Sequence, residues 1–191
     1  YLDFLIEQSR KFNINKVVFA GDIIDNHYSS YHESSTKGSG ADDELAAAIT
    51  RLQRYVRAFP EAIITIGNHD RMILRKAQSG GISSRWVRSF NEVLGAPGWE
   101  FVDHYTLGDN YFVHGEGMMA HTRANMLGMN VIQGHNHSKF QIVYVNHFAK
   151  RFGMFVGCGV DHESFAMDYA RTGPPMAKGC AVILDATNTP T

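Results

Sequence analysis

The stretch VVFAGDIID (17–25) decides how this sequence is interpreted, because an apolar run typical of a buried strand ends in glycine beside aspartate. Three later stretches end in the same way: IITIGNHD (63–70), YFVHG (111–115) and VIQGHNH (131–137). In open α/β sheets, ligands bind in the crevice at the carboxyl ends of the strands. We therefore expect Asp22, Asn68, His114 and His135 to meet at one such crevice.

The side chains at these four strand ends are those of a metal site. Carboxylate and amide oxygens together with imidazole favour Mn, Fe or Zn over metals that prefer sulfur. His135 and His137 are two residues apart, so in an extended segment both rings lie on one face. The adjacent glycines allow sharp turns and a close approach of the metal. One such strand end alone would be weak evidence, and four in a short chain indicate a shared function.

Composition limits the alternatives. The chain has 191 residues, 44% of them hydrophobic, and a formal charge of −1, which is typical of a globular domain without general attraction to nucleic acid or acidic membranes. Two cysteines are too few for a disulfide framework or a thiolate metal site, so we expect free thiols in a reducing compartment. No run is long and apolar enough to span a membrane.

Hydrophobic periodicity predicts alternating helices and strands in the first half of the chain and mainly strands in the second. Four helices are expected, over 1–12, over 42–59 up to Pro60, over 83–94 with Ser83 as cap, and over 118–127. Strands are expected over 16–20, 62–66, 111–114, 130–133, 140–145, 154–157 and 180–185. This order indicates an α/β domain of two packed sheets flanked by helices.

The four motifs GDIID, GNHD, VHG and GHNH resemble, in order and spacing, those of the calcineurin-like metallophosphoesterases. The tail, with GCGVDHESFAMDY (157–169) and KGCAVIL (178–184), most resembles phage-encoded and bacterial members. The resemblance covers roughly residues 16–137. It implies a sandwich of two mixed β-sheets between helices (αββα) and a pair of divalent transition metals, Mn, Fe or Zn, in the intact protein. It also implies hydrolysis of a phosphate mono- or diester by a metal-activated hydroxide.

Carried over residue by residue, the resemblance makes Asp22 the carboxylate that bridges both metals. Asn68, His114 and His135 would complete the second site, and His137 would bind the first metal. His69 would assist catalysis, either by stabilising charge or by protonating the leaving oxygen. Asp70 would orient His69, and Asp25 would hold first-sphere groups in place.

The family's first motif, Asp-x-His at the end of a first strand, is not found in this sequence. We therefore expect residues 1–191 to form a single domain that is truncated at its N-terminus and lacks its first strand. Without that motif the first metal keeps only Asp22 and His137, so one cation should bind tightly and a second weakly.

The substrate is less constrained by sequence. Tyr28, His32 and Arg71 are candidate substrate contacts, since the first two lie in an aromatic-rich loop and Arg71 follows GNHD directly. Small nucleotides, other phosphate esters and a single-stranded nucleic-acid backbone all stay open, as does a non-catalytic metal-binding scaffold. We expect a protein of the bacterial or phage-infected cytoplasm that needs no membrane, and the sequence leaves the oligomeric state open.

Overall fold

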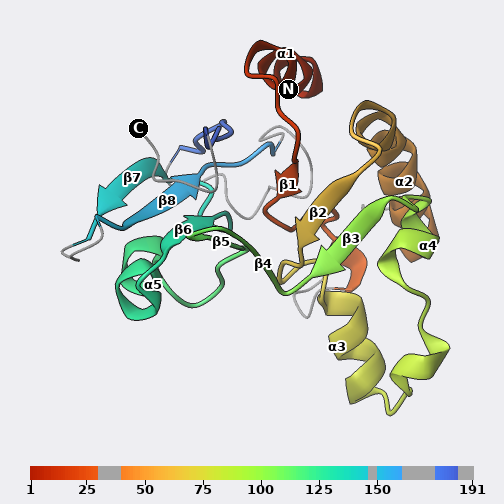
Figure 1. Cartoon of the computed structure of the whole chain (residues 1–191). Coiled ribbons are helices and arrows are strands. Elements are labelled where there is room, and N and C mark those ends of the chain that lie inside the picture. Colours follow the sequence, from red (N-terminus) through yellow and green to blue (C-terminus); the bar gives the residue numbers. More distant parts are fainter. Residues whose placement is uncertain (30–39, 146–149, 161–174, 185–191) are drawn as a thin grey trace.

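A computed structural model describes residues 1–29, 40–145, 150–160 and 175–184 as two β-sheets, with α2 (Ala41–Ala58) and α4 (Phe90–Leu94) on the outer side of one sheet and α5 (Ala120–Leu127) on the outer side of the other (Figure 1). The three-stranded sheet has the order β1-β2-β3 and joins Val18–Phe19, Ala62–Thr65 and Trp99–Val102 through parallel pairs. The five-stranded mixed sheet has the order β4-β5-β6-β8-β7. Its strands are His104–Leu107, Asn110–Val113, Asn130–Gln133, Phe152–Val156 and Phe140–Tyr144, in that order across the sheet. The predicted αββα class is confirmed.

The outer helices bury one face of each sheet. Helices α2 (Ala41–Ala58) and α4 (Phe90–Leu94) pack on β2 and β3, with Leu52, Ile64 and Trp99 at the centre of that cluster. Helix α5 (Ala120–Leu127) packs on the five-stranded sheet through Ala120 and Ala124. Alternate residues on β6 then face opposite ways, since Val131 contacts α5 and Ile132 belongs to the inner cluster.

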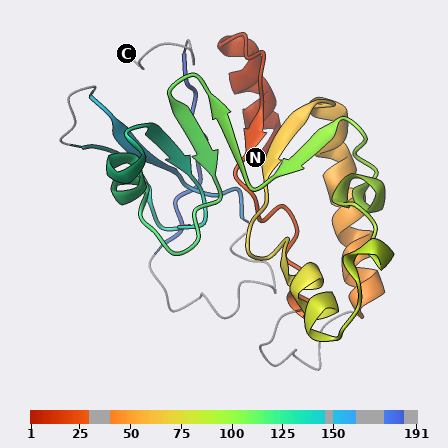
Figure 2. The ribbon, with the colours of Figure 1, turned by 60° about the horizontal axis from the view of Figure 1, so that its bottom comes forward.

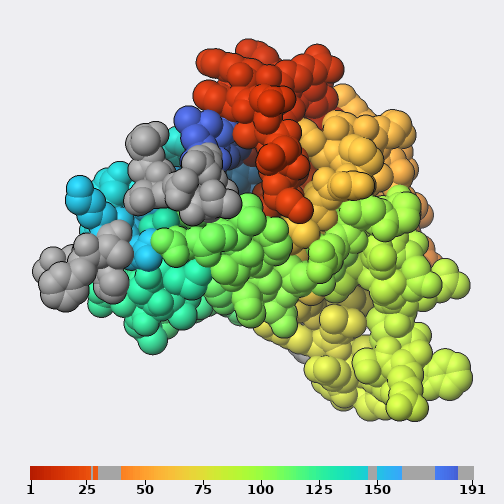
Figure 3. All heavy atoms as spheres, in the orientation of Figure 1, coloured from red at the N-terminus to blue at the C-terminus, as the bar shows by residue number. Residues whose placement is uncertain are grey.

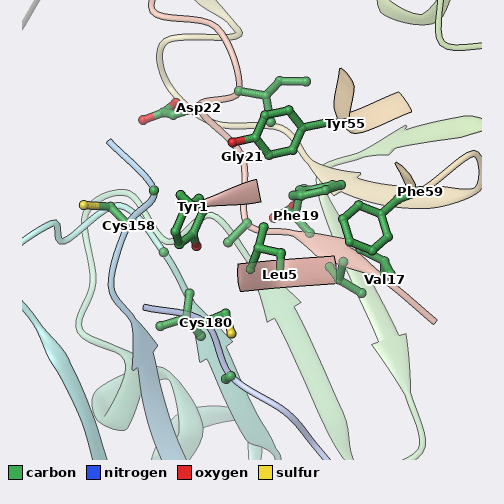
Figure 4. Close-up of a pocket in the computed structure, with 18 of the residues that line it drawn as sticks. Tyr1, Leu5, Val17, Phe19, Gly21, Asp22, Tyr55, Phe59, Cys158 and Cys180 are labelled. Carbon is green, nitrogen blue, oxygen red and sulfur yellow. Dashed lines mark hydrogen bonds between the residues drawn. The ribbon is translucent and has the colours of Figure 1, made fainter. Parts of the chain in front are cut away.

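A cleft of about 1560 Å³ separates the two sheets. Figure 2 shows the two sheets diverging from each other, with α1 (Leu2–Lys11) between their upper ends. The walls of the cleft are largely apolar and include Leu5 of α1, Phe19 of β1 and Phe112 of β5. Figure 4 shows Phe19, Tyr55 and Phe59 on one wall, Cys158 and Cys180 on the other, and Asp22 near one end. Among the described strands, β1 pairs on one side only, with β2.

The helix predicted over 83–94 is interrupted. The 3-10 helix η2 (Ser84–Trp86) begins at Ser83, whose hydroxyl accepts the Arg85 N–H, and Val87 is extended. A new helix, α4, then starts at Ser89, which forms a capping box with Glu92. The stronger second cap therefore divides the segment. Trp86 on η2 is 85% exposed.

Two further differences concern strands and short elements. The predicted strand over 180–185 is wrong for 180–184, which carry no strand, and residue 185 lies outside the described part. The described tail instead pairs through a single bridge between Cys158 and Lys178. The sequence analysis also missed α3 (Met72–Ser79), β3 and β4, whose four- to eight-residue lengths give too little periodicity. The other predicted elements are present with ends shifted by a few residues.

The central position of Ile64 predicts a large effect of truncation. Its side chain is fully buried between the sheet and α2, so Ile64→Ala should lower the free energy of unfolding by about 2–5 kcal/mol. Ile73→Ala, at a site that is 43% exposed on α3, is the matched control and should change it by less than about 0.5 kcal/mol. Urea denaturation followed by circular dichroism measures both, and equal effects would contradict this packing.

Candidate metal centre

Four strand ends from the two sheets meet at the mouth of the cleft. Asp22 follows β1, Asn68 follows β2, His114 follows β5 and His135 follows β6. Because β1 and β2 are parallel, and so are β5 and β6, each pair presents its carboxyl ends at the same edge. The predicted convergence of these residues is thus present in the structure.

The donor atoms surround a single point beside the His114 ring. Its Nε2 lies 3.0 Å from Asp22 Oδ2, 3.0 Å from Asn68 Oδ1 and 3.0 Å from His135 Nδ1. Ligand atoms of Asp22, His114 and His135 lie within 4.8 Å of one another. Side chains far apart in the sequence therefore offer four oxygen and nitrogen donors to one small volume.

Hydrogen bonding on the other side of the His114 ring favours a cation in that volume. Its Nδ1 lies 2.6 Å from the Ala20 carbonyl, which can only accept, so Nδ1 carries the proton. In the neutral ring, Nε2 then has a lone pair that faces the oxygens of Asp22 and Asn68. If Nε2 is protonated, its single hydrogen can be donated to one of its three neighbours, Asp22, Asn68 or His135, but not to all of them. A bound cation satisfies all of these lone pairs, and a backbone carbonyl that fixes the tautomer is typical of metal-ligating histidine.

The glycines in the motifs bring these donors close together. A Cβ atom on Gly67 would overlap the Asp22 carboxylate, and one on Gly21 would overlap the Thr65 carbonyl. Asp22 and His135 themselves have left-handed backbone conformations, with φ of 50° and 60°. Such conformations cost of order 1–3 kcal/mol each and concentrate at functional sites. The chain thus keeps a strained backbone at the two ligands that follow β1 and β6.

Asp70 holds the backbone around Asp22 and Gly67 in place. Its buried carboxylate accepts four backbone N–H groups. The donors are Asp22, Ile23, Ile24 and Gly67, at 2.9, 3.2, 3.4 and 2.9 Å respectively. Burial raises the pKa of Asp70, and these hydrogen bonds counteract the rise. Asp70 thereby ties the loop after β1 to the loop after β2.

The ring of His69 is oriented by Asp25 and not, as the sequence analysis expected, by Asp70. Its Nδ1 lies 2.9 Å from Asp25 Oδ1 and 2.8 Å from the Asp25 carbonyl. The correction has a geometric reason, since both oxygens of Asp70 are engaged by backbone N–H groups. The hydrogen bond to Asp25 raises the pKa of His69 to about 9 against the opposing effect of burial.

The pKa shifts at the ligands match their contacts. Burial alone would raise the pKa of Asp22, but the hydrogen bond from His114 holds it below its ordinary value. Burial lowers the pKa of both His135 and His137, which favours neutral rings with free lone pairs. For His114 the lowering effect of burial is overcome by Asp22, so its pKa is raised.

The remaining predicted residues lie around this centre. His137 lines the same cleft, but among the described residues it is outside the close donor group. Tyr28 lies on the 3-10 helix η1 (His27–Ser29), also lines the cleft and is 47% exposed. Arg71 bonds to Asp103 at 2.6 Å, and His32 lies outside the described residues. Candidate roles of these residues in substrate binding stay predictions.

Sequence reasoning missed two supporting groups. The Ala20 carbonyl fixes His114, but a backbone carbonyl gives no side-chain signal in a sequence. The buried Gln133 amide donates to the carbonyls of Gly115 and Met118 and so holds the turn after β5. A glutamine directly after the apolar pair Val131 and Ile132, buried at the end of β6, is the signal that could have pointed to it.

Comparison with known proteins agrees with the geometry. The family profile described as calcineurin-like phosphoesterase matches residues 1–157. The chain belongs to this family. No curated protein and no solved structure matches the chain. The family binds divalent metals and acts on phosphate esters, and the cluster of Asp22, His114 and His135 lies within the matched range. None of the described helices is long and apolar enough to cross a membrane.

The donor geometry predicts one tight metal site. Dialysis against Mn²⁺ or Zn²⁺ at low free metal should leave one equivalent per chain, measured by atomic emission. His135→Ala should weaken binding by more than about 100-fold, because it removes one of four donors. His137→Ala is the matched control from the same motif and should retain the tight equivalent. Equal loss in both variants would contradict the donor assignment.

Asp70 gives a second test through backbone positioning. In Asp70→Asn, either orientation of the amide leaves its NH₂ group facing two backbone N–H donors. We expect metal affinity to fall by about 10–100-fold although no ligand is removed. Isothermal titration calorimetry measures this, with Asp3→Asn on the exposed face of α1 as control. Unchanged affinity in Asp70→Asn would show that the loop does not need this carboxylate.

Proposed function

We propose that the protein hydrolyses a phosphate mono- or diester at the centre formed by Asp22, Asn68, His114 and His135. The observation that carries the proposal is the set of three ligand atoms at 3.0 Å from His114 Nε2. Membership of the calcineurin-like phosphoesterase family supports the reaction class. A divalent cation held there supplies positive charge for the phosphate oxygens and lowers the pKa of bound water.

His69 is the protein group best placed to assist the reaction. Its backbone N–H donates to Asp22 Oδ1 at 2.9 Å, so the residue is fixed beside the metal ligand. Its ring is held through Nδ1 by Asp25, which leaves Nε2 available for the substrate. A ring oriented in this way can donate a hydrogen bond to a phosphate oxygen or a proton to the leaving oxygen. Asp25 therefore acts as a positioning residue.

The retained His69–Asp25 pair disfavours the scaffold alternative. A binding module that had lost catalysis would need the metal ligands but would not need an oriented imidazole next to them. Asn26 adds a further constraint, because its amide donates to the His69 carbonyl at 3.0 Å. Three neighbouring contacts thus fix a residue that is not itself in the donor group.

The number of metals follows from the same donors. Among the described residues we assign two protein ligands, Asp22 and His137, to a second cation, and two ligands hold a transition metal weakly. We infer that an additional extended, apolar segment with further ligands belongs in the cleft beside β1. Its support is the unpaired side of β1 among the described strands, the apolar walls and the position of Asp22 near one end of the cleft (Figure 4). Manganese as the metal, a bacterial or phage source and a cytoplasmic location stay predictions.

Hydrolysis of bis(4-nitrophenyl) phosphate in Mn²⁺ tests the reaction class. We expect metal-dependent release of nitrophenol that chelation abolishes. His69→Ala should reduce the rate constant by about 10²–10⁴-fold, the usual contribution of an acid or base group, with metal content unchanged. His104→Ala, an exposed histidine stacked on Tyr111, is the control. A His69→Ala rate equal to that of the wild type would remove His69 from the mechanism.

A further inference from the structure

A basic segment begins directly after the metal centre. Residues 71–88, called here the basic arm, contain five Arg or Lys and no Asp or Glu, in a chain with a formal charge of −1. These residues are Arg71, Arg75, Lys76, Arg85 and Arg88. The arm consists of α3 and η2 and forms the lobe at the lower right of Figure 3, in yellow and lime. Its positive charge is thus concentrated on one projecting part of the molecule.

Two exposed aromatic side chains lie on turns that contact α3, one within the arm and one outside it. Trp86 on η2 is 85% exposed, the largest value among the exposed large hydrophobic residues of the described chain. Tyr28 on η1 is 47% exposed and lines the metal-bearing cleft. Both η1 and η2 contact α3. Helix α3 has eight residues and is therefore about 12 Å long.

Acidic neighbours from outside the arm lie close to three of its arginines at the protein surface. Arg71 pairs with Asp103 at 2.6 Å and Arg75 with Glu116 at 3.3 Å, and Arg88 lies near Glu92. The carboxylates of Asp103 and Glu116 are 76% and 46% exposed, and exposed ion pairs are weak enough to open for a stronger anion.

We propose that the basic arm binds single-stranded nucleic acid and leads it to the metal centre. Phosphates would contact the guanidinium groups of the arm, and an unstacked base would lie on Trp86. A positively charged track with exposed aromatic rings is how proteins bind single strands without sequence preference. A mononucleotide at the centre would need neither Trp86 nor charge at the far end of α3. The cleavage part of the inference rests on the proposed function, whereas the binding part does not.

Fluorescence anisotropy with a labelled 12-nucleotide oligothymidylate tests the binding part, in EDTA so that no metal contributes. The wild-type chain should bind. Trp86→Ala should weaken binding by about tenfold or more, because the variant loses the stacking of one base on the indole ring. Trp86→Phe keeps a stacking ring and should restore most of the affinity. Tyr144→Ala, at an aromatic residue that is 70% exposed on β7, is the control and should bind as the wild type does.

Salt dependence tests the charge. Arg85→Gln should lower the slope of log K against log salt by about 0.7, the value for one phosphate contact on a single strand. Arg57→Gln on α2 is the matched control and should leave the slope unchanged. Circular dichroism melting of each variant verifies that these exposed positions leave the fold intact.

Three results would overturn the inference. In the first, the wild type binds no oligonucleotide, and in the second, Trp86→Ala and Tyr144→Ala bind it equally. In the third, the protein binds phosphatidylserine vesicles through Trp86 but does not bind the oligonucleotide. Failure of the proposed function is distinguishable from these. A chain that hydrolyses the nitrophenyl diester but does not bind the oligonucleotide refutes the arm alone. A chain that binds the oligonucleotide in EDTA but hydrolyses no ester in Mn²⁺ refutes the reaction class alone.

Discussion

The site depends on one electrostatic constraint: several lone pairs point at the same small volume beside His114. The oxygens of Asp22 and Asn68 and a ring nitrogen of His135 all lie 3.0 Å from His114 Nε2. Hydrogen bonding can satisfy only part of this set, because Nδ1 of the ring is already committed to the Ala20 carbonyl. A positive ion resolves the conflict, and the surrounding fold holds the donors where only such an ion satisfies them.

The two sheets contribute to the constraint in different ways. The three-stranded sheet provides Asp22 and Asn68 on loops that the buried Asp70 joins through four backbone hydrogen bonds. The five-stranded sheet provides His114 and His135 from neighbouring parallel strands. Glycines at the strand ends let these loops approach more closely than any side chain would allow. Apolar packing against α2, α4 and α5 thus positions the ligands, and local strain at Asp22 and His135 is retained because this packing determines the backbone.

Sequence reasoning found the parts of this structure that repeat a pattern. The fold class and the meeting of four ligand residues followed from apolar strands that each end in glycine and a polar side chain. It could not predict which of two nearby side chains forms a given hydrogen bond. Whether Asp25 or Asp70 holds His69 depends on which carboxylate is already engaged by backbone N–H groups, and this is a tertiary fact. Short elements such as α3, β3 and β4 are fixed by packing and carry little periodicity of their own.

The exposure of Trp86 is a second feature that sequence periodicity did not predict. Periodicity predicted one helix over 83–94, but the structure divides this segment at the extended Val87 and the capping box at Ser89, and the Trp86 ring is exposed. A local capping preference here prevails over a hydrophobic pattern that spans both pieces. The consequence is an exposed aromatic ring on the basic arm.

Anomalous X-ray diffraction from crystals soaked in Mn²⁺ or Zn²⁺ tests the central claim most directly, because it locates the ion without reference to activity. The account predicts one strong peak within about 2.5 Å of donor atoms of Asp22, Asn68, His114 and His135, as coordination distances require. A strong peak elsewhere with none at this position, or no peak at any concentration that leaves the crystal intact, would contradict it.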